Sequence, residues 1–233
     1  MSTKPFVLSA EEVVRFNEEY LNKTPEEILE LAFSTVENIA FACSFGAEDV
    51  ALVDMIVKVN PQAKVFYLDT NLLFPETHEV KNRIVEKYSP NLIKYTPLLT
   101  LDEQAEQRGD QLWASDPNGC CGIRKVEPLK RALSELDAWI TGIRREQSPT
   151  RADAGVVELD TKFNLVKFNP IALWTEKQVW DYIVQHEVPY NKLHDQGFPS
   201  IGCIPCTRAV KPGEDPRAGR WANHEKTECG LHQ

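Results

Sequence analysis

Four of the six cysteines form two close pairs, and their chemistry suits an inorganic centre. Cys120 is followed directly by Cys121, whereas Cys203 and Cys206 belong to a Cys-Ile-Pro-Cys motif. A Cys-x-x-Cys motif alone fits a redox dithiol, half a zinc site or half an iron–sulfur site. Adjacent cysteines close an unstrained disulfide poorly, but at a helix start they lie about 100° apart and can both face one cluster. Four thiolates suit zinc or a 4Fe-4S cluster, so the sequence predicts a metal centre and leaves its identity open.

The two remaining cysteines have different surroundings. Cys229 lies near the C-terminus with Lys226 and His232 close by, and cations favour the thiolate, which is the nucleophilic form. A nucleophile on a mobile tail could enter a site and then present itself to a second protein. Cys43 ends an apolar run and is expected to be a small buried side chain.

Polar residues follow three predicted strands, at Ser44-Phe-Gly46, Leu68-Asp-Thr70 and Thr141-Gly-Ile-Arg-Arg145. In an open parallel sheet, ligands bind outside the carboxyl ends of the strands, where loop amides and helix N-termini favour anions. Ser44 and Gly46 offer a hydroxyl and exposed amides to a phosphate, although they equally suit any tight strand-to-helix turn. The loop is neither a Walker A motif nor a Gly-x-Gly-x-x-Gly motif.

Alternating strands and helices must position these residues. Capping boxes at Ser9 and Thr24 predict two N-terminal helices, over 9–22 and 25–35. Strands predicted over 38–43, 64–69, 92–96 and 138–142 alternate with helices, two of which are predicted over 75–88 and 101–108. A hairpin over 156–168 and a helix after Thr175 follow. This order predicts an α/β fold with a doubly wound, mostly parallel sheet. We expect one nucleotide-binding domain over 1–189, including the N-terminal helices, and an irregular C-terminal arm over 190–233 that holds Cys203, Cys206 and Cys229.

Composition restricts the class of protein. Of the 233 residues, 42% are hydrophobic and 26% are charged, as in an ordinary soluble globular protein. The net charge of -9 argues against a general nucleic-acid binder, while basic groups near the cysteines favour a small anionic substrate. No apolar run is long enough to predict a membrane span. Without a recognisable secretory signal, six cysteines indicate a reducing compartment, for which the cytoplasm is the default expectation.

Six motifs together resemble the assimilatory adenylyl-sulfate reductases. They are Ser-Phe-Gly-Ala-Glu-Asp at 44–49, Cys-Cys-Gly-Ile-Arg-Lys at 120–125, Gly-Ile-Arg-Arg-Glu-Gln-Ser at 142–148, Cys-Ile-Pro-Cys-Thr-Arg at 203–208, Glu-Asp-Pro-Arg-Ala-Gly-Arg-Trp at 214–221 and Glu-Cys-Gly-Leu-His at 228–232. The resemblance covers nearly the whole chain. It implies a fold of the adenine nucleotide alpha-hydrolase type and the thioredoxin-dependent reduction of adenosine 5'-phosphosulfate to sulfite and AMP.

The resemblance also implies roles for individual residues. Cys229 would attack the sulfate sulfur and become an S-sulfocysteine that thioredoxin resolves, His232 would support the tail, and Lys125 would link the metal centre to the substrate. The implied ligands of a 4Fe-4S cluster are Cys120, Cys121, Cys203 and Cys206. The implied substrate-binding residues are Ser44, Gly46, Leu68, Thr70, Arg144, Arg217 and Arg220.

Two alternatives stay open. The loop is Ser-Phe-Gly, whereas many cluster-bearing members have Ser-Phe-Ser-Gly, and the short form is similar to that of the cluster-free phosphoadenylyl-sulfate reductases. Use of the 3'-phosphorylated substrate, alone or with the other, is therefore open. A zinc-stabilised interaction module would explain the four cysteines, but neither the arginines nor the Cys229 tail. The sequence also leaves a homo-oligomer open.

Overall fold

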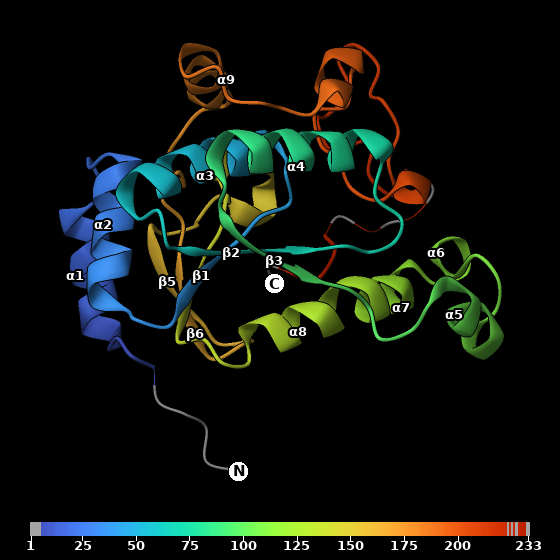
Figure 1. Cartoon of the computed structure of the whole chain (residues 1–233), viewed down its shortest axis with the longest axis horizontal. Helices are drawn as coiled ribbons and strands as arrows, with labels where there is room; N and C mark the ends of the chain where they lie inside the picture. The colour runs from blue at the N-terminus through green and yellow to red at the C-terminus, as the bar shows by residue number, and fades with distance from the viewer. Residues whose placement is uncertain (1–5, 223, 225, 227, 232–233) are drawn as a thin grey trace.

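A six-stranded sheet lies between two layers of helices in the computed structural model, which describes residues 6–222, 224, 226 and 228–231 (Figure 1). The strand order is β3-β2-β1-β4-β6-β5, and only the β5–β6 pair is antiparallel. The strands are β1 (Ile39–Ala42), β2 (Lys64–Leu68), β3 (Asn91–Tyr95), β4 (Ala138–Ile140), β5 (Val157–Asp160) and β6 (Leu165–Phe168). The predicted α/β fold with a doubly wound, mostly parallel sheet is confirmed.

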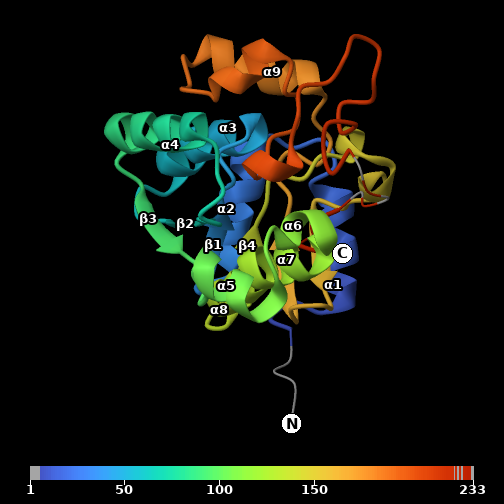
Figure 2. The ribbon, with the colours of Figure 1, turned by 90° about the vertical axis from the view of Figure 1, so that its right-hand side faces the viewer.

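Helices cover both faces of the sheet (Figures 1 and 2). The capping boxes predicted at Ser9 and Thr24 are present and begin the first two helices. One layer contains α2 (Pro25–Thr35), α3 (Ala47–Val59) and α4 (Pro75–Tyr88), and α9 (Glu176–Gln185) packs against α3 on the outer side of this layer. The opposite face is covered by α8 (Glu127–Leu133), while α1 (Ala10–Glu19) contacts β5 at the sheet edge. Three short helices extend beyond β3 and α8 in Figure 1: α5 (Leu101–Arg108), α6 (Leu112–Ser115) and α7 (Pro117–Cys121).

The alternation of side chains along the strands divides the core into two parts. Neighbouring residues of a strand point to opposite faces. In β1, Ile39 and Phe41 pack into the larger core with α2, α3, α4 and α9, whereas Ala40 packs with Leu129 and Trp139 in the smaller core under α8. Because both faces are covered, the central strands are apolar along most of their length, as is usual for a parallel sheet.

The strand order reverses beside β1, and this reversal creates the place for a site. The chain passes from β1 to β2 and β3 on one side, and later adds β4 on the other side of β1. Such a switch opens a crevice at the carboxyl ends of the two strands that diverge. The predicted ligand loops follow these strands, since Ser44–Gly46 comes after β1 and Thr141–Arg144 comes after β4.

The prediction that Cys120 and Cys121 begin a helix is wrong. They end α7, and the chain continues through a π-helical turn over Gly122–Val126 into α8. The helix begins earlier because the Asp116 side chain caps it by accepting from the amide of Gly119, at 2.8 Å, and Pro117 fits the first helical position. Pro128 lacks the amide hydrogen that a regular helix would donate to the carbonyl of Arg124, which accounts for the change of helix type.

The described part of the chain after residue 190 is mostly irregular. Its regular structure consists of two short 3-10 helices, Lys192–Gln196 and Ile204–Cys206. Isolated bridges from Leu73 to Cys203 and from Thr207 to Arg220 hold it in place. The division into a domain over 1–189 and an arm over 190–233 stays a prediction. No helix among the described residues is both long and apolar enough to cross a membrane.

Candidate active site

A cavity of about 760 Å³ lies at the carboxyl ends of the central strands. Each of the seven residues for which the resemblance implies substrate contact lines it, namely Ser44, Gly46, Leu68, Thr70, Arg144, Arg217 and Arg220. Lys125 and Cys229 line the same cavity. The fold therefore gathers side chains from the β1 loop, the β4 loop, the turn before α8 and the C-terminal tail around one space. His232 lies outside the described residues.

The loop after β1 is held from below by Asp49. Oδ2 of Asp49 accepts from both the amide and the hydroxyl of Ser44, each at 2.6 Å. Burial raises the pKa of Asp49 to about 6 even though these hydrogen bonds lower it. Phe45 adopts a positive φ of 62°, and Gly46 begins α3 without a side-chain cap. The first amides of α3 therefore remain free of a side-chain cap beside the cavity, which favours an anion there.

Gly142 allows the β4 loop to approach the β1 loop. A Cβ at position 142 would lie 2.0 Å from Oδ1 of Asp49 and 3.2 Å from Cβ of Glu48. Glycine is therefore required at this contact, because any other residue would push the two loops apart. Sequence analysis did not identify Asp49 as a site residue, since an acid in the first turn of a helix is common without any function.

Arg144 is buried in the cavity wall and already paired. Its Nε and Nη2 donate to Oε1 of Glu48 at 3.0 and 2.8 Å, and only 6% of its side chain is exposed. Glu146 lies at 3.6 Å from Nη1. Arg144 thus joins the β4 loop to the first turn of α3 and lines the cavity from a fixed position. The sequence indicated Arg144 but not Glu48, because 96 residues separate them.

The four predicted ligand cysteines line a second, smaller cavity together with Arg124, Lys125 and Trp221. All four are free thiols, and Cys120, Cys121 and Cys203 are buried. Burial first, and the neighbouring cysteines after it, raise the pKa of Cys120 to about 12 and that of Cys206 to about 11. Buried thiols gathered in this way would ionise readily only with a positive centre between them.

This donor set fits an iron–sulfur cluster, and an all-thiolate set is also found in structural zinc sites. The cavity has four cysteines and neither imidazole nor carboxylate, which is the all-thiolate set that such clusters use. Among the described residues, no three His, Cys, Asp or Glu side chains are grouped to hold one metal ion. Cluster ligands bind separate irons and therefore stand further apart than the ligands of one zinc ion.

Lys125 and Thr70 connect the two cavities. Lys125 lines both of them. Burial alone would lower the pKa of Lys125, but the nearby Cys203 and Cys229 raise it by more, so the ammonium form is retained. Oγ1 of Thr70, which lines the larger cavity, lies 3.3 Å from Sγ of Cys203. The cysteines thus make direct contact with the wall of the larger cavity.

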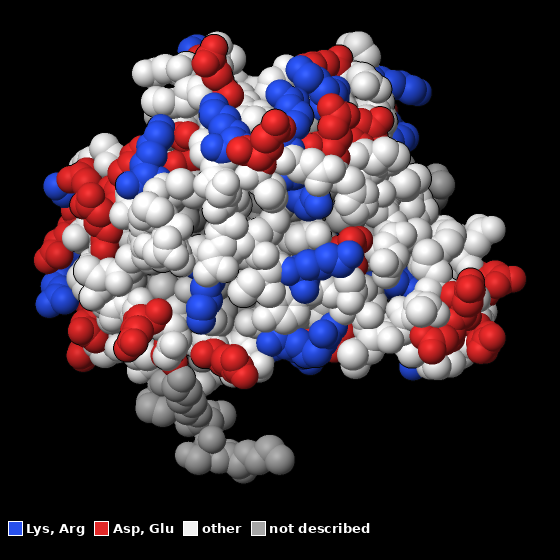
Figure 3. Space-filling model, in the orientation of Figure 1, with Lys and Arg blue, Asp and Glu red and all other residues white. Residues whose placement is uncertain are grey.

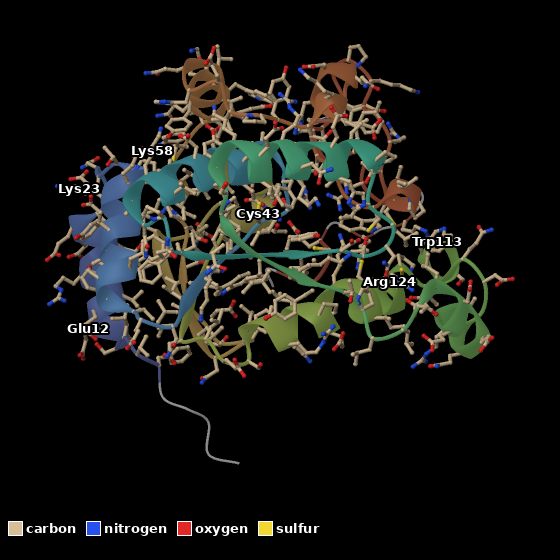
Figure 4. All side chains as sticks on the ribbon, in the orientation of Figure 1. Glu12, Lys23, Cys43, Lys58, Trp113 and Arg124 are labelled. Carbon is tan, nitrogen blue, oxygen red and sulfur yellow. The ribbon has the colours of Figure 1, made fainter. Side chains whose placement is uncertain are left out.

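Arg124, which is labelled in Figure 4, supports the same junction through hydrogen bonds. It is 1% exposed, and it donates to the carbonyl oxygens of Thr70 at 3.2 Å and Thr100 at 2.9 Å. It thereby ties the helical segment of the cysteines to the loops after β2 and β3. The same figure labels Cys43, which is 4% exposed within the larger core, and the prediction that it is a small buried side chain is confirmed.

Cys229 lies half-buried at the cavity, and its surroundings favour the thiolate. Burial alone would raise the pKa of Cys229, but Lys125, the Leu231 amide and Arg220 together lower it below the ordinary thiol value. Leu231 packs against the smaller core, which holds the end of the described chain beside α8. Glu228, the preceding residue, is buried and paired with Arg151 and Arg217. Sequence analysis missed Glu228, although it belongs to the tail motif.

The cavity is lined by side chains of both charges. Figure 3 shows acidic side chains gathered at both ends of the visible face, over α1 and α2 and over the short helices around α5, with Lys and Arg between them. Lys125, Arg144, Arg151, Arg217 and Arg220 all line the cavity, beside six carboxylates. Glu48 and Glu228 are paired with three of these arginines. The cations nevertheless offer several donors to a substrate with negative charges.

Comparison with known proteins gives concordant matches. Residues 38–209 match the family described as phosphoadenosine phosphosulfate reductase domain. An adenosine 5'-phosphosulfate reductase from Staphylococcus haemolyticus is 50% identical over 208 residues, which span 88% of this chain and 86% of the relative. Another, from Shouchella clausii, is 47% identical over 227 residues, or 97% and 94% of the two chains. The crystal structure of phosphoadenylyl-sulfate (PAPS) reductase from Candida auris in a phosphate complex is 31% identical with a TM-score of 0.79, covering 89% of this chain and 100% of that one.

Proposed function

We propose, from the premise that this chain belongs to the phosphoadenosine phosphosulfate reductase family, that it reduces adenosine 5'-phosphosulfate to sulfite and AMP in sulfate assimilation. As a member of the family it is an oxidoreductase that acts on a sulfur group. The observation that supports the substrate best is the shared cavity, which Cys229 lines together with the β1 loop and the cationic side chains of Lys125, Arg144, Arg217 and Arg220.

The cavity would bind the substrate by its charges and its loop. The phosphate and sulfate groups would lie near Lys125, Arg217 and Arg220, with the loop of Ser44 and Gly46 and the uncapped first amides of α3 at the phosphate. The adenosine would lie toward Leu68 and Thr70, at the end of β2. Arg144 would contribute from its fixed position beside Glu48. Held in this way, the sulfate sulfur would be within reach of the tail thiolate.

The first chemical step would be nucleophilic attack by Cys229. Its thiolate would form a bond to the sulfate sulfur while the bond from sulfur to the AMP oxygen breaks, and AMP would leave with the electron pair. The product on the chain would be an S-sulfocysteine. Lys125 and Arg220 would neutralise the negative charge that gathers between the thiolate and the phosphosulfate.

The second step would release sulfite by thiol exchange. A thiolate of thioredoxin would attack Sγ of Cys229, and the sulfur–sulfur bond to the sulfo group would break, with its electron pair leaving on sulfite. The second thioredoxin thiol would then displace Cys229 and regenerate its thiol. Two electrons thus pass from the thioredoxin dithiol to sulfur. This donor would place the reaction in a reducing compartment, for which we propose the cytoplasm.

Cys120, Cys121, Cys203 and Cys206 would hold a 4Fe-4S cluster. When bound, such a cluster would supply a fixed local charge and a rigid anchor rather than the electrons, which arrive through thiol exchange. The contact of Cys203 with Thr70 and the position of Lys125 between the cavities would carry this influence to the substrate. His232 would support the closed tail.

The test is sulfite release by anaerobically purified protein with thioredoxin, comparing adenosine 5'-phosphosulfate with its 3'-phosphorylated form. We expect a clear preference for the unphosphorylated substrate and no sulfite from Cys229→Ser, which should keep its brown colour. Comparable rates would favour the second candidate, a dual-substrate enzyme, to which the short Ser-Phe-Gly loop points. Preference for the phosphorylated form, or no sulfite from either, would refute the proposal.

A further inference from the structure

The residue before the proposed nucleophile is a buried acid with several polar partners. Oε2 of Glu228 lies 3.0 Å from Nη2 of Arg151 and 3.2 Å from Nη2 of Arg217. Oε1 accepts from the Thr150 hydroxyl and from Nε of Arg151, both at 3.2 Å, and more weakly from Ser148 at 3.4 Å. Only 5% of the Glu228 side chain is exposed, so the carboxylate exchanges nearly all its water for these donors.

The partners of Glu228 come from parts of the chain that are distant in sequence. Arg151 ends the 3-10 turn Pro149–Arg151 that follows the β4 loop, whereas Arg217 belongs to the C-terminal arm. Nη1 of Arg151 also donates to Oε1 of Gln147 at 2.5 Å, and the same oxygen accepts from the amide of Arg144 at 3.0 Å. A continuous set of polar contacts therefore joins the tail to the loop that lines the cavity.

Burial disfavours the charged form of the Glu228 carboxylate, and the neighbouring arginines favour it. Burial alone would raise the pKa of Glu228, but Arg151 and Arg217 together with the Thr150 hydroxyl hold it below its ordinary value. Removing one partner of such a buried pair leaves the other charge without compensation, and this costs much more than an exposed pair is worth. The tail can therefore adopt its position at low cost only while these groups are together.

We propose that Glu228 is a positioning residue that holds Cys229 at the cavity through Arg151 and Arg217. This inference rests on the proposed function in that Cys229 is taken as the nucleophile. The same carboxylate also orients Arg217, which the proposed function assigns to the substrate. A guanidinium has five donors, so Arg217 can bind Glu228 on one side and an anion on the other. The contacts of Glu228 would then place Cys229 and orient Arg217 for the anion at the same time.

The test measures how readily iodoacetamide reaches Cys229 in the full-length holoprotein. Cleavage after Lys226 yields a C-terminal peptide in which Cys229 is the only cysteine, so its alkylation is followed by mass spectrometry. Rates are measured across the alkaline range to obtain the plateau, where the thiolate is fully formed. The plateau reports access to Cys229, whereas the midpoint reports its pKa, and the two effects of removing a neighbouring charge are thus separated.

The variants are Glu228→Gln, Arg151→Met and the double variant. We expect each single variant to raise the plateau at least about tenfold, equivalent to about 1.4 kcal/mol, and the double variant to add little more. The matched control is Glu214→Gln, which removes an exposed pair with Arg208 in the same arm and should leave the plateau unchanged. If Glu228→Gln does not fold, Arg151→Met and Glu228→Asp, which keeps the charge but shortens its reach, test the same point.

Three results would overturn the inference. They are an unchanged plateau with only a shifted midpoint, additive effects of the two single variants, and an equal rise in Glu214→Gln. None of these measurements uses substrate or thioredoxin. Absence of sulfite in the turnover assay would therefore refute the proposed function without deciding this one, and an unchanged plateau in a protein that makes sulfite would refute this inference alone.

Discussion

At the scale of single residues, the charge state of Cys229 decides when the site can react. Lys125 is the cation that contributes most to stabilising its thiolate, and burial is the main opposing effect. Few other side chains could take this role, because the group must lie between the two cavities and stay protonated while buried. Lys125 stays protonated because the cysteines around it compensate for the lost hydration.

A pH profile tests this role of Lys125. The thiolate is the reacting form, so the rate of AMP release in a single turnover should fall as the pH falls through the pKa of Cys229. Because that pKa is lowered, the wild-type rate should persist below the ordinary thiol range. Lys125→Met removes the cation, so the fall should begin at higher pH, with a loss at neutral pH of at least about tenfold. The measurement uses saturating substrate between pH 6 and 9.

Lys58→Met provides the control for this profile. Lys58 pairs with Asp54 on α3, away from the cavity, and is labelled in Figure 4. Its profile should match that of the wild type. If the fall occurs at the same pH in the Lys125 variant and in the wild type, Lys125 does not set the pKa of Cys229.

At the scale of elements, the sequence predicted what depends on local signals. The bounds of α4 and α5 agree with those predicted, over 75–88 and 101–108, because Pro75 and the Thr100 cap mark their starts. The capping boxes predicted at Ser9 and Thr24 are confirmed for the same reason, since they too are local signals. The helix that contains Cys120 begins after Asp116, and the cap at Asp116 followed by Pro117 is the local signal for that start. The π-helical turn before Pro128 gives no simple pattern in a single sequence.

The parts of the site that could not be predicted are pairings across long stretches of chain. Glu48 and Arg144, or Arg151 and Glu228, are each ordinary charged residues in the sequence, and their importance arises only when the sheet brings them together. The cysteines and the tail were recognisable because their residue types are rare and chemically specific. An acid beside a helix start is common and has no specific chemistry. Asp49 could therefore be identified only from its buried contacts with Ser44.

Gly142 offers a test of how closely the β1 and β4 loops must approach. Gly142→Ala places a methyl group against Asp49, so we expect a loss of about 1–3 kcal/mol in the free energy of unfolding, and a higher KM for the nucleotide substrate. Denaturant unfolding and steady-state kinetics measure the two effects. Gly122→Ala is the matched control, since a Cβ there meets nothing within 4 Å. Equal free energies of unfolding and equal KM values in both variants would mean that the contact between Gly142 and Asp49 determines neither quantity.

At the scale of the whole molecule, the two cavities adjoin and share lining residues. The cysteines come from the helical segment before β4 and from the arm, and the substrate cavity is built from both sides of the sheet. Thr70 and Lys125 belong to the common wall. A substitution that disturbs the lining of one cavity should therefore also change the lining of the other.

Cys203→Ser tests this dependence. A hydroxyl is a poor ligand where soft thiolates are preferred, so the variant should lose bound iron and its visible absorbance. Sulfite release should fall at least about 100-fold, because the Thr70 contact and the Leu73 bridge at Cys203 are disturbed together. Cys43→Ala is the control and should keep its iron. Full activity in an iron-free Cys203 variant would show that the cysteine centre does not organise the site.

The separation of the two cysteine pairs along the chain has a consequence for biosynthesis. Cys120 and Cys121 leave the ribosome before β4, whereas Cys203 and Cys206 follow only after β4, β5, β6 and α9 have been made. For the proposed cluster, iron delivered early would find two thiols with no counterpart, so its assembly would follow the joining of the last strands to the sheet. Truncated chains that end before Cys203 would then remain colourless, and a brown colour would report that a chain had been synthesised past Cys206 and had folded.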